Sequence, residues 1–302
     1  MLLNIPDIEI TSLQDEIFMK KQINVFVIRL DKIHSIISGN KLFKLHYFLE
    51  EALQSSHKAI LTFGGAYSNH LAATAYACKL SGLKSIGIVR GEKPTQLSHT
   101  LLFCLENNMQ LKFISRNEYS KKEAPDFQQS LITEFGECTI VPEGGYHPLG
   151  AKGAARIMDI LKEKPFSHIC CATGTATTIA GLLLGAEKQQ QIISIPVLKG
   201  MNDIEKRISF LTENKIDLNQ LKILNGYDFG GYAKSNATLF TFMNRLYQQY
   251  QLPTDFVYTA KMLFGIFDSI EKDTFPKGSS IACLHTGGLQ GNLSLPKNTL
   301  LF

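Results

Sequence analysis

Ser-Gly-Asn-Lys-Leu-Phe-Lys-Leu occupies positions 38–45, and Phe-Gly-Gly-Ala-Tyr-Ser-Asn-His occupies positions 63–70. The first motif places Lys41 shortly after a glycine, and the second is a glycine-rich turn that carries Ser68 and Asn69. This pairing indicates a reactive amine that faces a binding site for an anion. The rest of the chain is organised around these two motifs.

A helix is predicted to begin at the first motif. Leu42, Leu45, Leu49 and Leu53 recur at helical spacing, so Lys41 should lie at or near a helix N-terminus. The helix dipole disfavours a cation at that end. The position therefore favours a lysine that works as a neutral amine or as an imine.

Strands and helices alternate after this helix. The strands are predicted at 59–63, 85–90, 110–114 and 139–142, and the helices at 70–80, 98–107 and 124–135. A strand at 24–29 precedes the first motif. A second series follows, with strands at 167–172, 191–197 and 280–285 and helices at 151–162, 179–188, 201–214, 237–249 and 259–272.

This order predicts an α/β fold with two domains, each with a mainly parallel sheet flanked by helices. Residues 1–44 and 151–302 are expected to form the larger, discontinuous domain. Residues 45–150 are expected to form the smaller, inserted domain. Lys41 and Ser68 would then face each other across a cleft between the domains.

Composition argues against several classes of protein. Of the 302 residues, 44% are hydrophobic and 19% are charged, which is typical of a soluble globular protein. The net charge is +4 and the basic residues are scattered, so nucleic acid is not an expected partner. The histidines show no paired metal-ligand spacing, so no metal site is expected.

Cysteine usage and hydropathy favour a cytoplasmic protein that does not cross a membrane. The six cysteines form no Cys-x-x-Cys pair, which favours buried reduced thiols. The N-terminal residues predict no signal peptide. The run 169–186 is almost free of charge, but its Thr-Gly-Thr-Ala-Thr-Thr interior favours a buried strand, a turn and a helix over a membrane span.

That interior, Thr173 to Thr178, lies between a predicted strand and a predicted helix. Its consecutive backbone N–H groups and hydroxyls suit a phosphate. It lacks the Gly-Lys-Ser/Thr ending of a P-loop and the Gly-x-Gly-x-x-Gly of a dinucleotide site, so neither a triphosphate nor NAD is indicated. Taken alone, a plain tight turn is an equally good interpretation.

Four motifs occur in order along the chain: Gly-Asn-Lys, Gly-Gly-x-x-Ser-Asn-His, the hydroxyl-rich loop and a final His-Thr-Gly-Gly. Together they resemble the pyridoxal-phosphate enzymes of the tryptophan synthase β superfamily, fold type II. More narrowly, they resemble the 1-aminocyclopropane-1-carboxylate deaminase / D-cysteine desulfhydrase family. The resemblance implies pyridoxal 5'-phosphate as cofactor, a small amino acid as substrate and a homodimer.

The resemblance also implies roles in cofactor binding. Lys41 would be the Schiff-base lysine, and Asn69 would hydrogen-bond the phenolic oxygen of the cofactor. Lys44 would contact the phosphate, although a surface lysine is an equally good interpretation. Thr286 would meet the pyridine nitrogen. The phosphate would be held by the loop residues Thr173, Gly174, Thr175, Ala176, Thr177 and Thr178.

On the substrate side, Ser68 would hold the substrate carboxylate together with the N–H groups of Asn69 and His70. Tyr258 and Tyr232 would line the pocket, although each could also be a half-buried core aromatic. Lys41, Ser68 and Tyr258 are the predicted catalytic residues. Lys41, once released by substrate, would take the α-proton as general base.

Three positions favour the desulfhydrase branch of the family. Thr259 stands where ring-opening deaminases carry a glutamate, Thr286 where they carry a leucine, and His70 where they carry a glutamine. The predicted reaction is elimination from D-cysteine to pyruvate, sulfide and ammonia. The alternatives are deamination of 1-aminocyclopropane-1-carboxylate to 2-oxobutanoate, and a non-catalytic protein that binds the cofactor or an amino acid.

Other positions depart from both branches. Tyr67 replaces the usual glutamine, and Tyr146 and His147 fill a loop that is normally less bulky. These side chains are expected to reshape the substrate pocket.

Overall fold

The computed structural model describes residues 7–34, 37, 39–162 and 164–302, so Ser38 of the first motif lies outside it. Its strands are β1 (Ile10–Leu13), β2 (Asn24–Ile28), β3 (Ala59–Gly64), β4 (Lys84–Arg90), β5 (Met109–Ile114), β6 (Thr139–Val141), β7 (His168–Thr173), β8 (Gln191–Pro196), β9 (Leu221–Ile223) and β10 (Ser280–Leu284).

The α-helices in the same residues are α1 (Glu16–Lys21), α2 (Asn40–Gln54), α3 (Asn69–Leu80), α4 (His99–Glu106), α5 (Arg116–Tyr119), α6 (Pro125–Phe135), α7 (Pro148–Ala155), α8 (Ile157–Leu161), α9 (Thr177–Gly185), α10 (Ile204–Leu211), α11 (Ala237–Tyr250) and α12 (Thr259–Glu271). Short 3₁₀ helices lie at η1 (Leu30–Lys32), η2 (Glu143–Gly145), η3 (Leu218–Gln220) and η4 (Leu289–Ser294).

The larger sheet has the strand order β1-β2-β10-β7-β8-β9. Its strands pair in parallel except for β1, which runs antiparallel to β2. The last strand of the chain, β10, lies between β2 and β7, because Cys283 pairs with both Val27 and Cys170. The sheet is therefore built from both ends of the chain.

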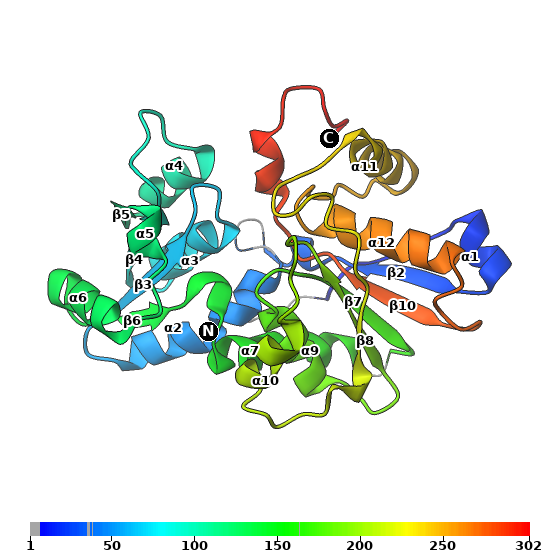
Figure 1. Cartoon of the computed structure of the whole chain (residues 1–302), viewed down its shortest axis with the longest axis horizontal. Coiled ribbons are helices and arrows are strands. Elements are labelled where there is room, and N and C mark those ends of the chain that lie inside the picture. Colours follow the sequence, from blue (N-terminus) through cyan, green and yellow to red (C-terminus); the bar gives the residue numbers. More distant parts are fainter. Residues whose placement is uncertain (1–6, 35–36, 38, 163) are drawn as a thin grey trace.

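The smaller sheet has the order β5-β4-β3-β6, and all its strands are parallel. It comes entirely from residues 59–141 and lies beside the larger sheet (Figure 1). Both sheets are covered by helices on both faces, as parallel strands require. The predicted α/β fold with two mainly parallel sheets is confirmed.

Side chains of alternate residues in the larger sheet enter two separate cores. Ile169 and Cys171 face α2, α7 and α9, whereas Cys170 and Ala172 face α1 and α12. This is the period of two that a strand imposes. All six cysteines are buried and unpaired, and no helix in the described residues is long and apolar enough to cross a membrane.

Glycines allow α2, α7 and α9 to pack with their backbones close together. A Cβ on Gly153 of α7 would lie 2.1 Å from the Phe43 carbonyl oxygen of α2. A Cβ on Gly181 of α9 would lie 2.6 Å from the Ala151 carbonyl oxygen of α7. The first turn of α2, which carries Lys41, is thus pressed against α7, and α7 packs in turn against α9, the helix that follows the hydroxyl-rich loop.

Several predicted boundaries were wrong. The helix predicted at 151–162 is two helices, because the Arg156 N–H bonds to Gly153 three residues back and not four. It begins earlier because Pro148 fits a first helical position and His147 Nδ1 accepts the Leu149 N–H. The helices predicted at 179–188 and 201–214 are α9 and the shorter α10.

Four short elements were not predicted, namely β1, α1, α5 and β9. The strands that build the smaller sheet all lie inside the predicted inserted segment, residues 45–150. The domain boundaries at 44/45 and 150/151 stay a prediction.

Candidate active site

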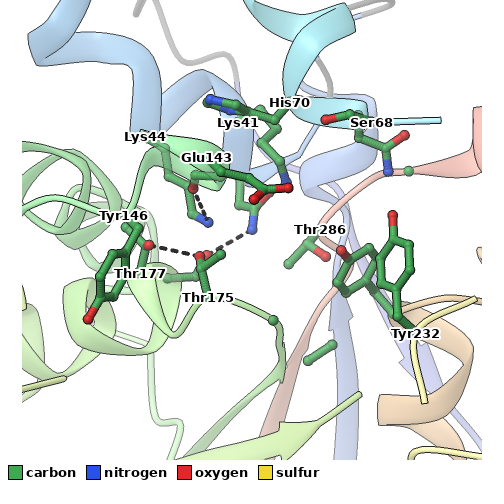
Figure 2. Close-up of a pocket in the computed structure, with 18 of the residues that line it drawn as sticks. Lys41, Lys44, Ser68, His70, Glu143, Tyr146, Thr175, Thr177, Tyr232 and Thr286 are labelled. Carbon is green, nitrogen blue, oxygen red and sulfur yellow. Dashed lines mark hydrogen bonds between the residues drawn. The ribbon is translucent and has the colours of Figure 1, made fainter. Parts of the chain in front are cut away.

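One cavity of about 530 Å³ lies at the carboxyl ends of the parallel strands of both sheets (Figure 2). Ligands of open α/β sheets bind at this edge. Every residue that the sequence assigned to cofactor or substrate lines it: Lys41, Lys44, Ser68, Asn69, His70, Thr173, Gly174, Thr175, Ala176, Thr177, Thr178, Tyr232, Tyr258 and Thr286. The structure thus brings together segments that are separated by more than half the chain.

Lys41 is held by its neighbour in the Gly-Asn-Lys motif. Lys41 Nζ donates to Asn40 Oδ1 at 2.8 Å, and Asn40 Nδ2 donates to Thr178 Oγ1 at 2.8 Å. Asn40 is only 6% exposed. Its side chain therefore joins the lysine to the hydroxyl-rich loop.

Two lysines, Lys41 and Lys44, lie about one helical turn apart at the N-terminal end of α2. Burial lowers the pKa of Lys41 from 10.5 to about 8. Burial, and next the charge of Lys41, hold the pKa of Lys44 well below its usual value. Lys44 Nζ donates to the Gly144 carbonyl oxygen at 3.1 Å, and Gly144 in turn lies against Thr175. Lys44 is 5% exposed, so the interpretation as a surface lysine was wrong.

The loop 173–178 leads from β7 into α9. Ala176 has φ 66°, and its side chain cannot cap the helix, so the first N–H groups of α9 have no side-chain cap. The hydroxyls of Thr175 and Thr177 lie 2.9 Å apart. The loop thus offers a helix N-terminus, two hydroxyls and a nearby amine to an anion.

The second motif builds another helix N-terminus on the opposite side of the cavity. Ser68 is the N-cap of α3, and its Oγ accepts the Leu71 N–H at 3.2 Å. Among the described residues no acceptor takes the Ser68 hydroxyl proton, so it is available to a ligand. Asn69 Oδ1 is buried and has no hydrogen-bond partner among the described residues.

His70 is buried beneath this motif. The Thr62 hydroxyl donates to the Val141 carbonyl at 2.7 Å, so it accepts from His70 Nε2 at 2.9 Å, and His70 carries its proton on Nε2. Burial and the charges of Lys41 and Lys44 lower the pKa of His70 to about 3. The imidazole is therefore neutral.

Tyr258 and Tyr232 form an aromatic wall, with ring centroids 6.2 Å apart. Burial raises the pKa of Tyr258 well above its usual value, so the phenol is protonated. Buried Asp255 fixes the start of α12: its carboxylate accepts the N–H groups of residues 257, 258 and 259 at 3.0, 2.7 and 2.9 Å. Tyr258 packs against Gly174, whose Cβ would lie 3.3 Å from its ring.

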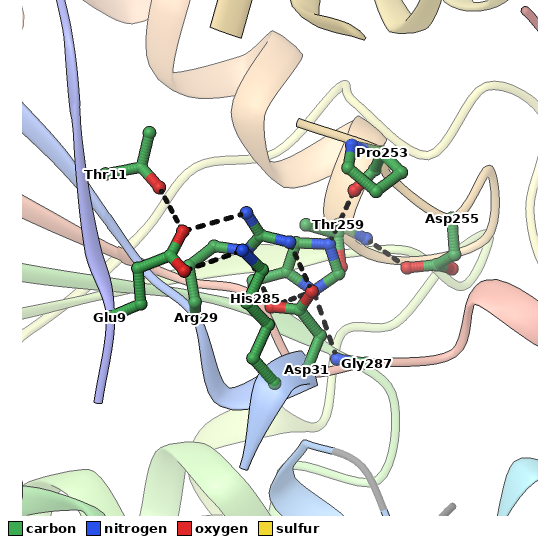
Figure 3. A network of polar contacts seen from close by, with 10 residues as sticks. Glu9, Thr11, Arg29, Asp31, Pro253, Asp255, Thr259, His285 and Gly287 are labelled. Carbon is green, nitrogen blue, oxygen red and sulfur yellow. Dashed lines mark hydrogen bonds and ion pairs between the residues drawn. The ribbon is translucent and has the colours of Figure 1, made fainter. Parts of the chain in front are cut away.

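Thr286 follows β10 and is supported from behind by a buried polar network (Figure 3). Arg29 binds Asp31 through two hydrogen bonds of 2.8 and 2.6 Å, and Asp31 lies 3.4 Å from His285 Nδ1. His285 Nε2 donates to the Pro253 carbonyl at 2.8 Å, and its Nδ1 accepts the Gly287 N–H at 3.3 Å. Both residues that flank Thr286 are therefore fixed.

These groups suit pyridoxal phosphate. The loop 173–178 and Lys44 would hold the phosphate, and Lys41 would supply the amine for the imine. Asn69 Oδ1 is a buried acceptor without a partner among the described residues, which leaves this amide available to a ligand. Thr286 carries a hydroxyl that can meet a ring nitrogen without forcing its protonation.

Comparison with known proteins agrees with this fit. The profile of the family described as "Pyridoxal-phosphate dependent enzyme" matches residues 6–287. The chain belongs to this family. It is a pyridoxal-phosphate-dependent enzyme, and the cofactor predicted from the sequence is confirmed.

Relatives narrow the family to the group that contains 1-aminocyclopropane-1-carboxylate deaminases and D-cysteine desulfhydrases. A Thermotoga maritima protein with the provisional name 1-aminocyclopropane-1-carboxylate deaminase is 30% identical over 89% of each chain. The mitochondrial bifunctional D-cysteine desulfhydrase/1-aminocyclopropane-1-carboxylate deaminase of Arabidopsis thaliana is 29% identical, over 84% of this chain and 70% of its own. A D-cysteine desulfhydrase of Klebsiella pneumoniae is 26% identical, over 87% and 86%.

Solved structures agree. The crystal structure described as an ACC deaminase homologue superposes with a TM-score of 0.80 at 26% identity, covering 95% of this chain and 91% of that one. The O-ureido-L-serine synthase structure, at 12% identity and a TM-score of 0.70, shares the fold, with 97% and 93% of the two chains covered.

Sequence reasoning missed some residues that line the cavity or support its walls. Asn40 stands inside a motif that was recognised, so its role could have been found from its place beside Lys41. Asp255 shows the weaker signal of an acid four residues before the start of α12. Lys261 and Arg90, described below, give no local signal, because their partners lie in other segments.

Proposed function

We propose that the enzyme catalyses α,β-elimination and deamination of a small amino acid, with D-cysteine as the substrate. In the balanced reaction, D-cysteine and water give pyruvate, hydrogen sulfide and ammonia. The α C–H bond and the Cβ–S bond break, and sulfur leaves as sulfide. Water then replaces the nitrogen.

The observation that carries the proposal is the low pKa of Lys41 beside the capped N-terminus of α3. With a pKa of about 8, a useful fraction of the Lys41 amine is neutral at physiological pH and can accept the α-proton. Ser68 and the first N–H groups of α3 would hold the substrate carboxylate. Bound pyridoxal phosphate supplies the electron sink that makes the α-proton acidic.

Thr259 favours elimination over ring opening. It is fully buried at the start of α12. Threonine has no carboxyl group, so it cannot replace the glutamate that a ring-opening deaminase carries at this position. Ring opening of 1-aminocyclopropane-1-carboxylate is the second candidate, since the relative with the highest identity cited above carries that name.

Product analysis distinguishes these reactions. The purified enzyme, loaded with pyridoxal phosphate, is incubated with D-cysteine, L-cysteine or 1-aminocyclopropane-1-carboxylate, and sulfide, pyruvate and 2-oxobutanoate are measured. Sulfide and pyruvate from D-cysteine are expected. 2-Oxobutanoate alone would favour the second candidate, and no product from any substrate would favour a non-catalytic binder.

Two variants test the role of Lys41. Lys41→Ala should abolish product formation and the reducible adduct between cofactor and protein. Lys188→Ala, which changes an exposed lysine outside the cavity, should leave both intact. We also propose a homodimer in the cytoplasm, which light scattering and cell fractionation test.

A further inference from the structure

Charged side chains line part of the cavity that the proposed reaction does not use. Arg90, Lys122 and Arg207 contribute cations, and Glu123 and Glu143 contribute carboxylates. The thiol of cysteine needs none of these groups. These groups can therefore determine which substrate side chains, other than that of cysteine, the pocket accepts.

Two of the three cations are already paired. Arg207 binds Asp203 through Nε and Nη2, each at 2.8 Å. Lys122 Nζ lies 3.7 Å from Glu143 and 3.8 Å from Glu123. Their charges are largely neutralised within the protein.

Arg90 differs from both. In the residues that the structure describes, no carboxylate lies within ion-pair distance of its guanidinium, and its neighbour is the face of the Tyr119 ring, at 5.7 Å. An arginine that lines a cavity without an anionic partner can donate two parallel hydrogen bonds to a carboxylate or phosphate.

The sheet places this guanidinium at the substrate end of the cavity. Arg90 is the last residue of β4, and Gly64 pairs with Val89, so Gly65, the first residue after β3, lies opposite Arg90. Arg90 Nη2 would be 3.5 Å from a Cβ on Gly65. Burial raises the pKa of Tyr232, and the Arg90 charge opposes that rise, so its field reaches the aromatic wall.

We propose that Arg90 binds an anionic group at the far end of the substrate side chain. Among β-substituted amino acids other than cysteine, the pocket then prefers those whose leaving group carries a carboxylate or a phosphate. This inference rests on the proposed elimination. The Cβ–X bond breaks, the leaving group departs with its electron pair and takes a proton, and water and the remaining three carbons give pyruvate and ammonia.

A matched pair of substrates tests the charge alone. S-carboxymethylcysteine carries a carboxylate where S-carbamoylmethylcysteine carries an amide. Both enantiomers of each compound are assayed. O-phosphoserine tests a substrate with a phosphate group. In the wild type, kcat/KM should be about tenfold or more higher for the carboxylate than for the amide. In Arg90→Gln the ratio should fall to about one, and Arg90→Lys should restore part of it. Arg116→Gln, the same change at an arginine outside the cavity, should keep the wild-type ratio.

Two results would overturn the inference. One is a wild-type ratio near one for the matched pair with no preference for O-phosphoserine. The other is an equal loss for both members of the pair in Arg90→Gln, which would place Arg90 on the α-carboxylate that they share. If no compound is turned over, the proposed function fails, and calorimetric binding of the same pair to the cofactor-loaded protein still tests Arg90.

Discussion

The backbones of Gly39 and Thr286 are in contact, which joins the segment that carries Lys41 to the segment that follows β10. A Cβ on residue 39 would lie 1.9 Å from the Thr286 carbonyl oxygen, and Gly39 has φ 72°. The Gly39 N–H also donates to the Leu30 carbonyl at 2.8 Å. Position 39 therefore helps to set the distance between Lys41 and Thr286, and only glycine fits at this position.

Gly39→Ala should separate these two groups. The added methyl cannot fit against a backbone oxygen, so α2 or the 285–288 segment must move, at a cost of about 1–3 kcal/mol in the free energy of unfolding. Cofactor affinity should fall as well. Gly291→Ala, with open space around its Cβ, is the control. Urea unfolding and a cofactor titration measure both effects, and wild-type values for Gly39→Ala would contradict the argument.

The pKa of Lys41 predicts how the apoprotein takes up its cofactor. Only the neutral amine attacks an aldehyde, and a fall of the pKa from 10.5 to about 8 raises the neutral fraction at pH 7 from ~0.0003 to ~0.1. The rate of imine formation should rise about tenfold per pH unit below pH 8 and level off above it. Stopped-flow absorbance measures this. A rate that still climbs toward pH 10 would show an unperturbed lysine.

Lys261 should hold the loop that carries Tyr232. Its side chain is fully buried, and Nζ donates to the carbonyl oxygens of Asp228 and Gly231, each at 2.7 Å. Lys261→Met removes both hydrogen bonds and leaves two carbonyls unsatisfied, so the loop should loosen. KM should rise more than kcat falls, and proteolysis near residue 230 should speed up. Lys234→Met, at an exposed position on the same loop, is the control. An unchanged rate of proteolysis in Lys261→Met would show that Lys261 does not hold the loop.

The same lysine gives a pH dependence with a definite sign. Burial lowers its folded pKa from 10.5 to about 8, so between these values the unfolded chain binds more protons. Stability then rises with pH across this window for the wild type. Subtracting the Lys261→Met curve isolates this contribution. A difference that is flat from pH 8 to 10.5 would show that the amine does not titrate there.

The network behind Thr286 contains a buried ion pair. Arg29 and Asp31 have side chains only 3% and 4% exposed. Asp31→Leu leaves a buried cation, so the free energy of unfolding should fall by about 3–5 kcal/mol, and the double variant Arg29→Met/Asp31→Leu should recover much of it. Asp273→Leu breaks the exposed pair with Lys21 and should cost less than about 1 kcal/mol. Equal losses for Asp31→Leu and the double variant would contradict this.

The fold was largely predictable because its signals are local. The apolar spacing from Leu42 onward marks α2, and the runs of β-branched residues mark the long strands. The edge strands β1 and β9 have only four and three residues, which is too short for a periodic pattern. Helix α1 carried a usable signal that was missed, since Asp15 caps it and Lys20 and Lys21 end it.

The site divides in the same way. Residues inside short motifs, such as Lys41, Ser68 and Thr175, could be predicted because the motif carries the chemistry, and all three line the cavity. Lys261 was not, because its partners are carbonyls 30 and 33 residues away. Arg90 was not predicted either. Whether a guanidinium has an anionic partner depends on residues that are close in space and not in sequence.

The position of β10 has a consequence for the synthesis of the protein. This strand is made after the other strands of the larger sheet, yet it lies between β2 and β7 in the middle of that sheet. While the ribosome is still translating residues 142–279, the smaller sheet can already form, but β2 has no parallel neighbour. The nascent chain must keep the apolar strands of the larger sheet from pairing elsewhere until β10 emerges. The larger sheet, and with it the segment that carries Thr286, can therefore be completed only after β10 has been made.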